Sequence, residues 1–79
     1  MHVAVELSLY PLTDQFVPPI LDFIARPRDR PGLAVVTNSM STQVSGEFDV
    51  VFEALRAEMG RSFAGEHRAV FVMKVIGMP

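Results

Sequence analysis

Hydrophobic and polar residues alternate over the first ten positions of the chain. Successive side chains of a β-strand point to opposite faces, so this alternation predicts a strand over residues 2–10 with one face in the core. The core side holds Val3, Val5, Leu7 and Leu9, and the other side holds His2, Ala4, Glu6, Ser8 and Tyr10. The second face combines an acid, a hydroxyl and an aromatic ring. Such a face is typical of an ordinary solvated sheet or of a surface that holds a flat polar ligand.

Between residues 13 and 25 the hydrophobic period changes to that of a helix. The apolar residues at helical spacing are Phe16, Ile20, Phe23 and Ile24. Thr13 and Asp14, just before them, are residue types that cap helix N-termini. Pro18 and Pro19 fit the first turn of a helix, whose amide groups lack partners in any case, better than its interior. We therefore predict a short amphipathic helix after the first strand, which stops at Pro11.

The middle of the chain predicts a loop followed by a hairpin. Residues 26–32 contain two prolines and a glycine and are expected to form the loop. Residues 33–37 are apolar and β-branched enough for a second strand, and residues 41–45 for a third, shorter one. The chain reverses at residues 38–40, where no Asn-Gly type signal fixes the turn.

A second amphipathic helix and a last strand complete the pattern. Ser45 or Glu47 can cap this helix. Its apolar stripe consists of Phe48, Val51, Phe52, Leu55 and Met59. The helix ends at Gly60, or it continues through Phe63 to Gly65, since either glycine suits a left-handed cap. Residues 68–76 alternate again and predict the last strand.

These elements predict an α+β chain of order β-α-β-β-α-β that forms a single domain over residues 1–79. Right-handed crossovers, and the need to bury both helical stripes on one sheet face, favour a ferredoxin-like sandwich with an antiparallel sheet of strand order 4-1-3-2. The first strand is then central, and it carries Glu6 mid-sheet on the face opposite the helices. Val70, Val72 and Ile76 share that face, so we expect a second subunit to cover them.

Composition narrows the class of protein further. A chain of 79 residues buries only about 60% of its unfolded surface, so with 49% hydrophobic residues we expect a homo-oligomer, a dimer or a tetramer. The net charge of −2 does not favour nucleic-acid binding, which needs many basic residues to neutralise phosphates. The one short basic run, at residues 26–30, is interrupted by Asp29 and by proline. The chain has no cysteine, which excludes disulfides and thiolate metal sites. No apolar run approaches the roughly 20 residues that span a bilayer, so we expect a cytoplasmic protein without a membrane segment.

Residue types suited to catalysis are sparse. His2 and His67 are far apart in the sequence, and no serine has a companion base at a recognisable spacing. Two histidines without a helical i, i+4 pair lack the usual geometry of a metal site, and the isolated glycines form no phosphate loop or dinucleotide fingerprint. We therefore expect a protein that is not an enzyme and that has no catalytic residues, no metal and no cofactor.

Three segments together resemble one known family. They are residues 6–12 (Glu-Leu-Ser-Leu-Tyr-Pro-Leu), residues 38–46 (Asn-Ser-Met-Ser-Thr, then Val44 and Gly46) and Phe48-Asp49 at the start of the second helix. From Val5 to about Ile76 the chain resembles the YkoF-like thiamine/hydroxymethylpyrimidine-binding family. The resemblance implies a ferredoxin-like, non-enzymatic binder of thiamine or its pyrimidine moiety, in the short single-domain form. A site that tandem members build from two domains would then arise between subunits.

The chemistry of this ligand class singles out candidate residues. An aminopyrimidine places a ring-nitrogen acceptor beside an amino donor, so it needs a paired donor and acceptor together with flat apolar contact. The amide of Asn38 offers both functions, and the carboxylate of Glu6 can accept from the amino group. An aromatic or thioether side chain can cover the ring, and a nearby acid also suits the thiazolium cation of intact thiamine. The predicted ligand-binding residues are Glu6, Ser8, Tyr10, Asn38, Met40, Ser41 and Thr42.

Each candidate also has a structural explanation. Glu6 can pair with Lys74 across adjacent strands, Asn38 can serve the turn alone, and Tyr10 can be a packing residue. Gly46 is expected to meet a backbone requirement at the strand-to-helix turn. The alternative functions are a regulatory or assembly module that acts through oligomerisation and, ranked last, an acylphosphatase-like enzyme. That enzyme needs a cationic cradle for its anion, and the candidate arginines lie in the proline-interrupted loop.

Overall fold

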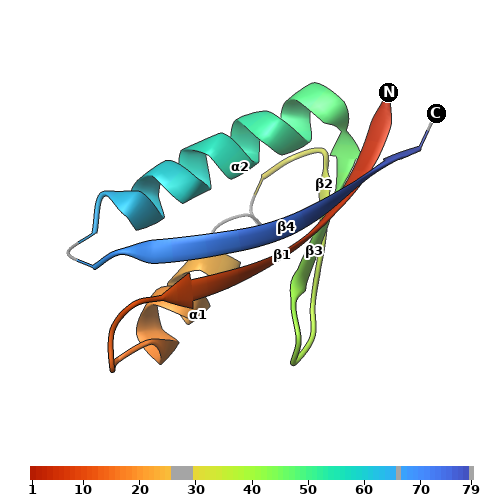
Figure 1. The fold of residues 1–79 in the computed structure, drawn as a ribbon. Coiled ribbons are helices and arrows are strands. Elements are labelled where there is room, and N and C mark those ends of the chain that lie inside the picture. The colour runs from red at the N-terminus through yellow and green to blue at the C-terminus, as the bar shows by residue number, and fades with distance from the viewer. Residues whose placement is uncertain (26–29, 66, 79) are drawn as a thin grey trace.

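Four strands and two helices follow one another in the predicted order (Figure 1). The computed structural model describes residues 1–25, 30–65 and 67–78. The elements are β1 (His2–Pro11), α1 (Val17–Ala25), β2 (Leu33–Thr37), β3 (Thr42–Glu47), α2 (Phe48–Phe63) and β4 (Ala69–Met78). The strands form one antiparallel sheet of order β2-β3-β1-β4, which confirms the predicted ferredoxin-like arrangement with β1 in a central position.

The two neighbours of β1 differ in how far they follow it. β4 pairs with β1 along its whole length, from His2 opposite Met78 to Pro11 opposite Ala69. β3 pairs with β1 only from His2 to Leu7, which lies opposite Thr42. The last four residues of β1 therefore have a neighbouring strand on one side only.

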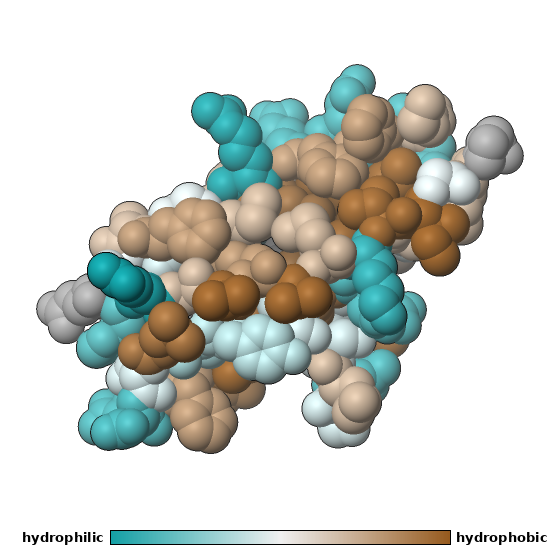
Figure 2. All heavy atoms as spheres, viewed as in Figure 1, coloured by the Kyte–Doolittle hydropathy of each residue, from teal (hydrophilic) through white to brown (hydrophobic). Residues whose placement is uncertain are grey.

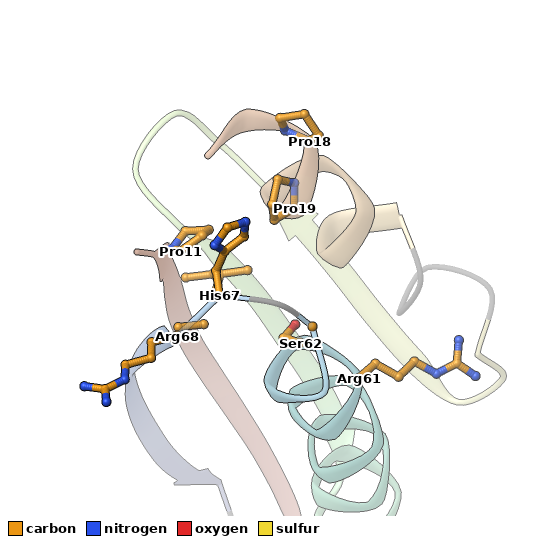
Figure 3. A pocket seen from close by; sticks show the side chains of 10 residues that line it. Pro11, Pro18, Pro19, Arg61, Ser62, His67 and Arg68 are labelled. Carbon is orange, nitrogen blue, oxygen red and sulfur yellow. The ribbon is translucent and has the colours of Figure 1, made fainter. Parts of the chain in front are cut away.

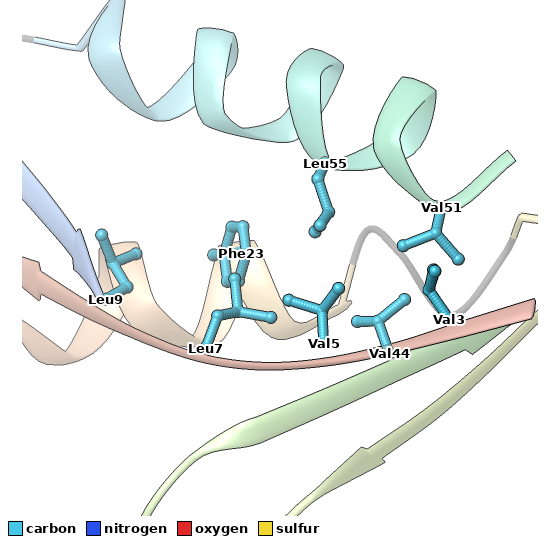
Figure 4. Close-up of a cluster of buried hydrophobic side chains, with 8 residues drawn as sticks. All are labelled: Val3, Val5, Leu7, Leu9, Phe23, Val44, Val51 and Leu55. Carbon is cyan, nitrogen blue, oxygen red and sulfur yellow. The ribbon is translucent and has the colours of Figure 1, made fainter. Parts of the chain in front are cut away.

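The core lies between one face of the sheet and the two helices (Figure 4). The alternating residues of β1 that were assigned to the core are all buried, as is Val44 of β3. Val51 and Leu55 of α2 point onto them, and Phe23 reaches the same cluster from α1. The buried members of both apolar stripes thus lie on the same side of the sheet, as predicted. Phe16, which precedes α1, and Phe48, at the start of α2, were assigned to the stripes but are 52% and 40% exposed.

Arg30, in the segment between α1 and β2, forms an ion pair with α2 that the pattern did not predict. α1 begins at Val17, which places Pro18 and Pro19 in its first turn, as expected. The basic run and most of the predicted loop fall on residues 26–29, which lie outside the described residues. Arg30, at the end of the run, lies 3.2 Å from the carboxylate of Glu58, whose side chain is 3% exposed.

Some element ends differ from the predicted ones. β3 is shifted to Thr42–Glu47 and β4 runs on to Met78. α2 passes through Gly60 to Phe63, and its C-cap is Ala64 with a right-handed φ of −76°. The prediction of a left-handed glycine cap was therefore wrong: within the described residues only Gly32 and Gly46 have a positive φ.

Gly46 meets a backbone requirement, as predicted. Its φ is +156°, and a Cβ atom at this position would lie 2.6 Å from the carbonyl oxygen of Gly32. The close approach of the two backbones joins the end of β3 to the start of β2, where Leu33 pairs with Gly46. Because the clashing atom is main chain, no side-chain movement can relieve it.

The sheet face opposite the helices is not covered within the described part of the chain. Val70, Val72 and Ile76 of β4 are exposed there by 44%, 54% and 63%, and Val36 of β2 by 60%. Figure 2, drawn in the same view as Figure 1, shows apolar side chains gathered along β4. The sequence pattern predicted this open apolar face correctly.

The described residues contain neither a membrane-spanning helix nor a metal-binding cluster. Neither helix is long and apolar enough to cross a membrane. No group of three or more histidine, aspartate or glutamate side chains is arranged to hold a metal ion in the same part of the chain.

Candidate functional site

A cavity of about 170 Å³ opens where β3 stops following β1. Its walls come from three places: the last residues of β1, the inner side of α1, and the turn between β2 and β3. The residues that line it are Leu7, Ser8, Leu9, Tyr10, Ile20, Phe23 and the whole segment from Thr37 to Thr42. We call it the hairpin cavity.

Six of the seven predicted ligand-binding residues line the hairpin cavity. They are Ser8, Tyr10, Asn38, Met40, Ser41 and Thr42. Glu6 lies outside it, because β3 is still paired with β1 at that position and Glu6 faces the open side of the sheet. Its carboxylate lies 3.9 Å from Nζ of Lys74. Glu6 thus forms the cross-strand ion pair with Lys74 that was its structural alternative to ligand binding. It borders a separate shallow hollow together with Lys74 and Ile76.

The side chain of Asn38 shapes the turn of the hairpin. Its Oδ1 atom accepts hydrogen bonds from the backbone N–H groups of Met40, at 2.8 Å, and Ser41, at 3.0 Å. The backbone N–H of Asn38 donates to the carbonyl oxygen of Ser41 at 3.0 Å. An asparagine that bonds the backbone two and three residues ahead is a common turn-forming arrangement. Within the described residues the Nδ2 donor of Asn38 makes no hydrogen bond.

Two further hydrogen bonds tie the turn to the strands. The hydroxyl of Ser8 lies 3.3 Å from the carbonyl oxygen of Met40 and donates to it. The hydroxyls of Thr37 and Thr42 lie 3.1 Å apart across the hairpin, and Thr42 is 5% exposed. The cavity therefore has a polar wall held in one geometry by its own hydrogen bonds.

The opposite wall of the hairpin cavity is apolar. Leu7 and Leu9 form it with Phe23, and Ile20 of α1 completes it. Sequence reasoning placed these side chains in the core and missed their second role as cavity walls. The helical period shows which face of α1 is apolar, but it does not show that this face extends past the end of β3.

Two side chains of the cavity lie largely in solvent. Tyr10 is 55% exposed and Met40 is 83% exposed. An aromatic ring and a flexible thioether are suited to cover the face of a flat ligand. No histidine or carboxylate of the described residues lines the cavity, so its groups can bind by hydrogen bonding and apolar contact but offer no general base.

A second and larger cavity of about 350 Å³ lies at the start of α1 (Figure 3). Pro11, Pro18 and Pro19 line it together with the end of α2 and the start of β4. Its polar residues are Arg61, Ser62, His67 and Arg68. Figure 3 shows the side chains of Arg61 and Arg68 extending away from it in opposite directions, so they do not form an anion cradle. None of the predicted site residues lines this cavity.

A family model described as the YKOF-related family matches residues 2–76 of the 79 in the chain. The chain belongs to the YKOF-related family. This match covers the first three strands, both helices and β4 as far as Ile76, and with them the hairpin cavity. No curated protein matches the chain.

Solved structures share the fold of this YKOF-related chain at low sequence identity. The hypothetical protein MJ1052 of Methanocaldococcus jannaschii is 22% identical, with a TM-score of 0.84 over 99% of this chain and 81% of its own. A domain of unknown function from Bacillus cereus is 17% identical, with a TM-score of 0.77 over 100% of this chain and 78% of its own. TM0486 of Thermotoga maritima, a candidate thiamine biosynthesis/salvage protein, is 18% identical, with a TM-score of 0.71 over 99% of this chain and 85% of its own. At these identities the likeness shows the fold.

Proposed function

We propose that this protein binds thiamine or its hydroxymethylpyrimidine moiety in the hairpin cavity and does so without catalysing a reaction. The observation that carries the proposal is the cavity itself, where hydroxyl, amide and carbonyl groups face an apolar wall. Membership of the YKOF-related family and the likeness to the Thermotoga maritima thiamine biosynthesis/salvage candidate support the choice of ligand. Among the described residues no histidine or carboxylate lines the cavity, which supports binding rather than turnover.

The size of the cavity favours one ring as its occupant. Sites for drug-sized ligands have volumes of about 300–1,000 Å³. A cavity of about 170 Å³ is smaller than these, so it suits a single substituted ring. In the proposed complex the pyrimidine lies inside, against Phe23 and Ile20. The thiazolium of intact thiamine stays at the mouth, where the exposed ring of Tyr10 offers a cation–π contact.

The proposal includes a homo-oligomer in which a second copy covers the open sheet face. Three exposed aliphatic side chains of β4 and Val36 of β2 lie on that face, and the only ion pair described across it is between Glu6 and Lys74. Large exposed apolar patches mark interaction sites. The same observation supports the alternative function, an assembly module without a ligand. Ligand titration separates the two.

Calorimetric titration tests the proposed function. The protein is titrated with thiamine, with hydroxymethylpyrimidine and with the isolated thiazole alcohol. The first two are expected to bind and the third is not, because only the pyrimidine enters the cavity. Ile20→Trp, which fills the cavity, should abolish binding. Leu21→Trp is the matched control, since Leu21 is 61% exposed on the same helix and does not line the cavity.

Two results would contradict the proposal. One is a wild-type protein that binds neither thiamine nor hydroxymethylpyrimidine. The other is an Ile20→Trp variant that is folded and binds with unchanged affinity, which would place the ligand elsewhere.

A further inference from the structure

The backbone of β1 exposes a donor and an acceptor to the hairpin cavity. In an antiparallel ladder the N–H and C=O groups of one residue point to the same edge, and consecutive residues alternate between the two edges. Leu12 donates its N–H to the carbonyl oxygen of Arg68, beside β4, at 2.8 Å. Met1 accepts from the N–H of Phe48, at the end of β3, at 2.9 Å. Even-numbered residues of β1 therefore turn their polar backbone groups to β4, and odd-numbered residues turn theirs to β3.

Leu9 is the odd-numbered residue where the β3 ladder has already ended. Leu7 still pairs with Thr42, the first residue of β3. The next odd residue, Leu9, faces the turn, and within the described residues neither its N–H nor its C=O has a backbone partner on that side. Pro11 follows as the next odd residue and has no N–H to satisfy, which explains why β1 tolerates proline there.

These two backbone groups belong to a buried residue. Leu9 is 8% exposed, and it lines the hairpin cavity. More than about 90% of buried backbone groups in proteins have a hydrogen-bond partner. An N–H and a C=O that reach a cavity from one residue, side by side, form a site for a flat ligand with a donor beside an acceptor.

We infer that the backbone N–H and C=O of Leu9 recognise the amidine edge of an aminopyrimidine. The ring nitrogen accepts from the N–H, and the exocyclic amino group donates to the C=O, so that the ligand takes the place of the missing residue of β3. The ring then lies at the edge of the sheet, between Phe23 and the turn that Asn38 shapes. This inference rests on the proposed function, and it adds the contact that selects an amino-substituted ring.

Amide hydrogen exchange tests the inference first without ligand. The amide of Leu9 is expected to exchange at least about tenfold faster than those of Leu7 and Tyr10, its neighbours in the ladders to β3 and β4. Equal protection of all three amides in the free protein would overturn the inference, because Leu9 would then already have a partner.

Ligand titration followed by NMR tests it second. Hydroxymethylpyrimidine should shift the Leu9 amide downfield and slow its exchange. An analogue with methyl in place of the amino group should bind about tenfold more weakly, since the C=O of Leu9 loses its donor. Binding that leaves the Leu9 amide unchanged would refute the inference and leave the proposed function intact. No binding of either thiamine or hydroxymethylpyrimidine would refute both.

Two substitutions of Leu9 distinguish the contribution of its backbone N–H to binding from that of its side chain. Leu9→Pro and Leu9→Ala both shorten the side chain, but only proline removes the N–H, which faces away from the β4 ladder. Leu9→Ala should keep its preference for the amino-substituted ring over the methyl analogue, and Leu9→Pro should bind both about tenfold more weakly than Leu9→Ala does. Should Leu9→Pro fail to fold, the exchange measurement on the unmodified protein decides the question.

Discussion

Substitution of Asn38 separates a structural role from a ligand-binding role at one position. Asn38→Ala removes the Oδ1 acceptor that holds the N–H groups of Met40 and Ser41, together with the Nδ2 donor. Asn38→Asp keeps an acceptor oxygen for both N–H groups and removes only the donor. The two variants therefore differ in stability if the turn bonds matter, and they agree in ligand affinity if the Nδ2 donor contacts the ligand.

The magnitudes follow from the two hydrogen bonds. Each contributes about 0.5–1.5 kcal/mol, and both are exposed, so Asn38→Ala should lower the free energy of unfolding by about 1–2 kcal/mol. For a domain of this size each kcal/mol lowers Tm by roughly 4–8 °C, which gives a fall of about 5–15 °C. Asn38→Asp should keep the Tm of the unmodified protein. Its affinity for the neutral hydroxymethylpyrimidine should fall about tenfold.

Thermal unfolding is followed by circular dichroism, and affinity is measured by calorimetric titration with hydroxymethylpyrimidine. This ligand is uncharged, so the carboxylate that Asn38→Asp introduces does not attract it electrostatically. Equal Tm values for Asn38→Ala and the unmodified protein would refute the argument from the turn. Unchanged affinity in Asn38→Asp would show that Nδ2 makes no contact with the ligand.

The remaining predictions concern the scaffold and the open sheet face. Gly46→Ala should lower the free energy of unfolding by about 2–3 kcal/mol, because its Cβ meets the backbone of Gly32, whereas Gly60→Ala, in open space within α2, should raise it by about 0.5–1 kcal/mol. Urea unfolding measures both variants, and equal changes of the same sign in the free energy of unfolding would refute the predicted clash at position 46. Arg30→Ala should cost about 1–3 kcal/mol in the same assay, since the carboxylate of Glu58 is buried, and an unchanged midpoint would contradict this. Sedimentation velocity at micromolar concentration should show no monomer of the unmodified protein and a monomer of Val72→Glu, and a heat-stable monomer without any substitution would exclude the proposed oligomer.

The fold follows from local patterns because each element has its own period. The alternation in β1 and the stripe of α2 each select one buried face, and right-handed crossovers that place both helices on that face favour the observed strand order. The ends of elements were less predictable, since Gly60 lies inside α2 although glycine often ends a helix. The buried Glu58 was missed for a similar reason. Its partner Arg30 lies far away in the sequence, and a periodicity argument reads acidic residues as exposed.

The candidate site was partly predictable for a physical reason. Ser8 and Tyr10 meet the hairpin turn because β1 continues beyond β3, and the polar run that starts at Asn38 forms that turn. Glu6 shares their side of the strand but lies where β3 is still paired, so it faces the open sheet. Strand periodicity assigns a side chain to a face. It does not show where along the strand the neighbouring strand ends, and that point determines the position of the cavity.

A crystal structure of the protein grown with thiamine tests the central claim most directly. The account predicts density for the pyrimidine ring in the hairpin cavity, with its amino group and neighbouring ring nitrogen within hydrogen-bond distance of the backbone of Leu9, and the thiazolium near Tyr10. Thiamine bound instead in the larger cavity beside Pro18, His67 and Arg68, or on the open sheet face, would contradict it.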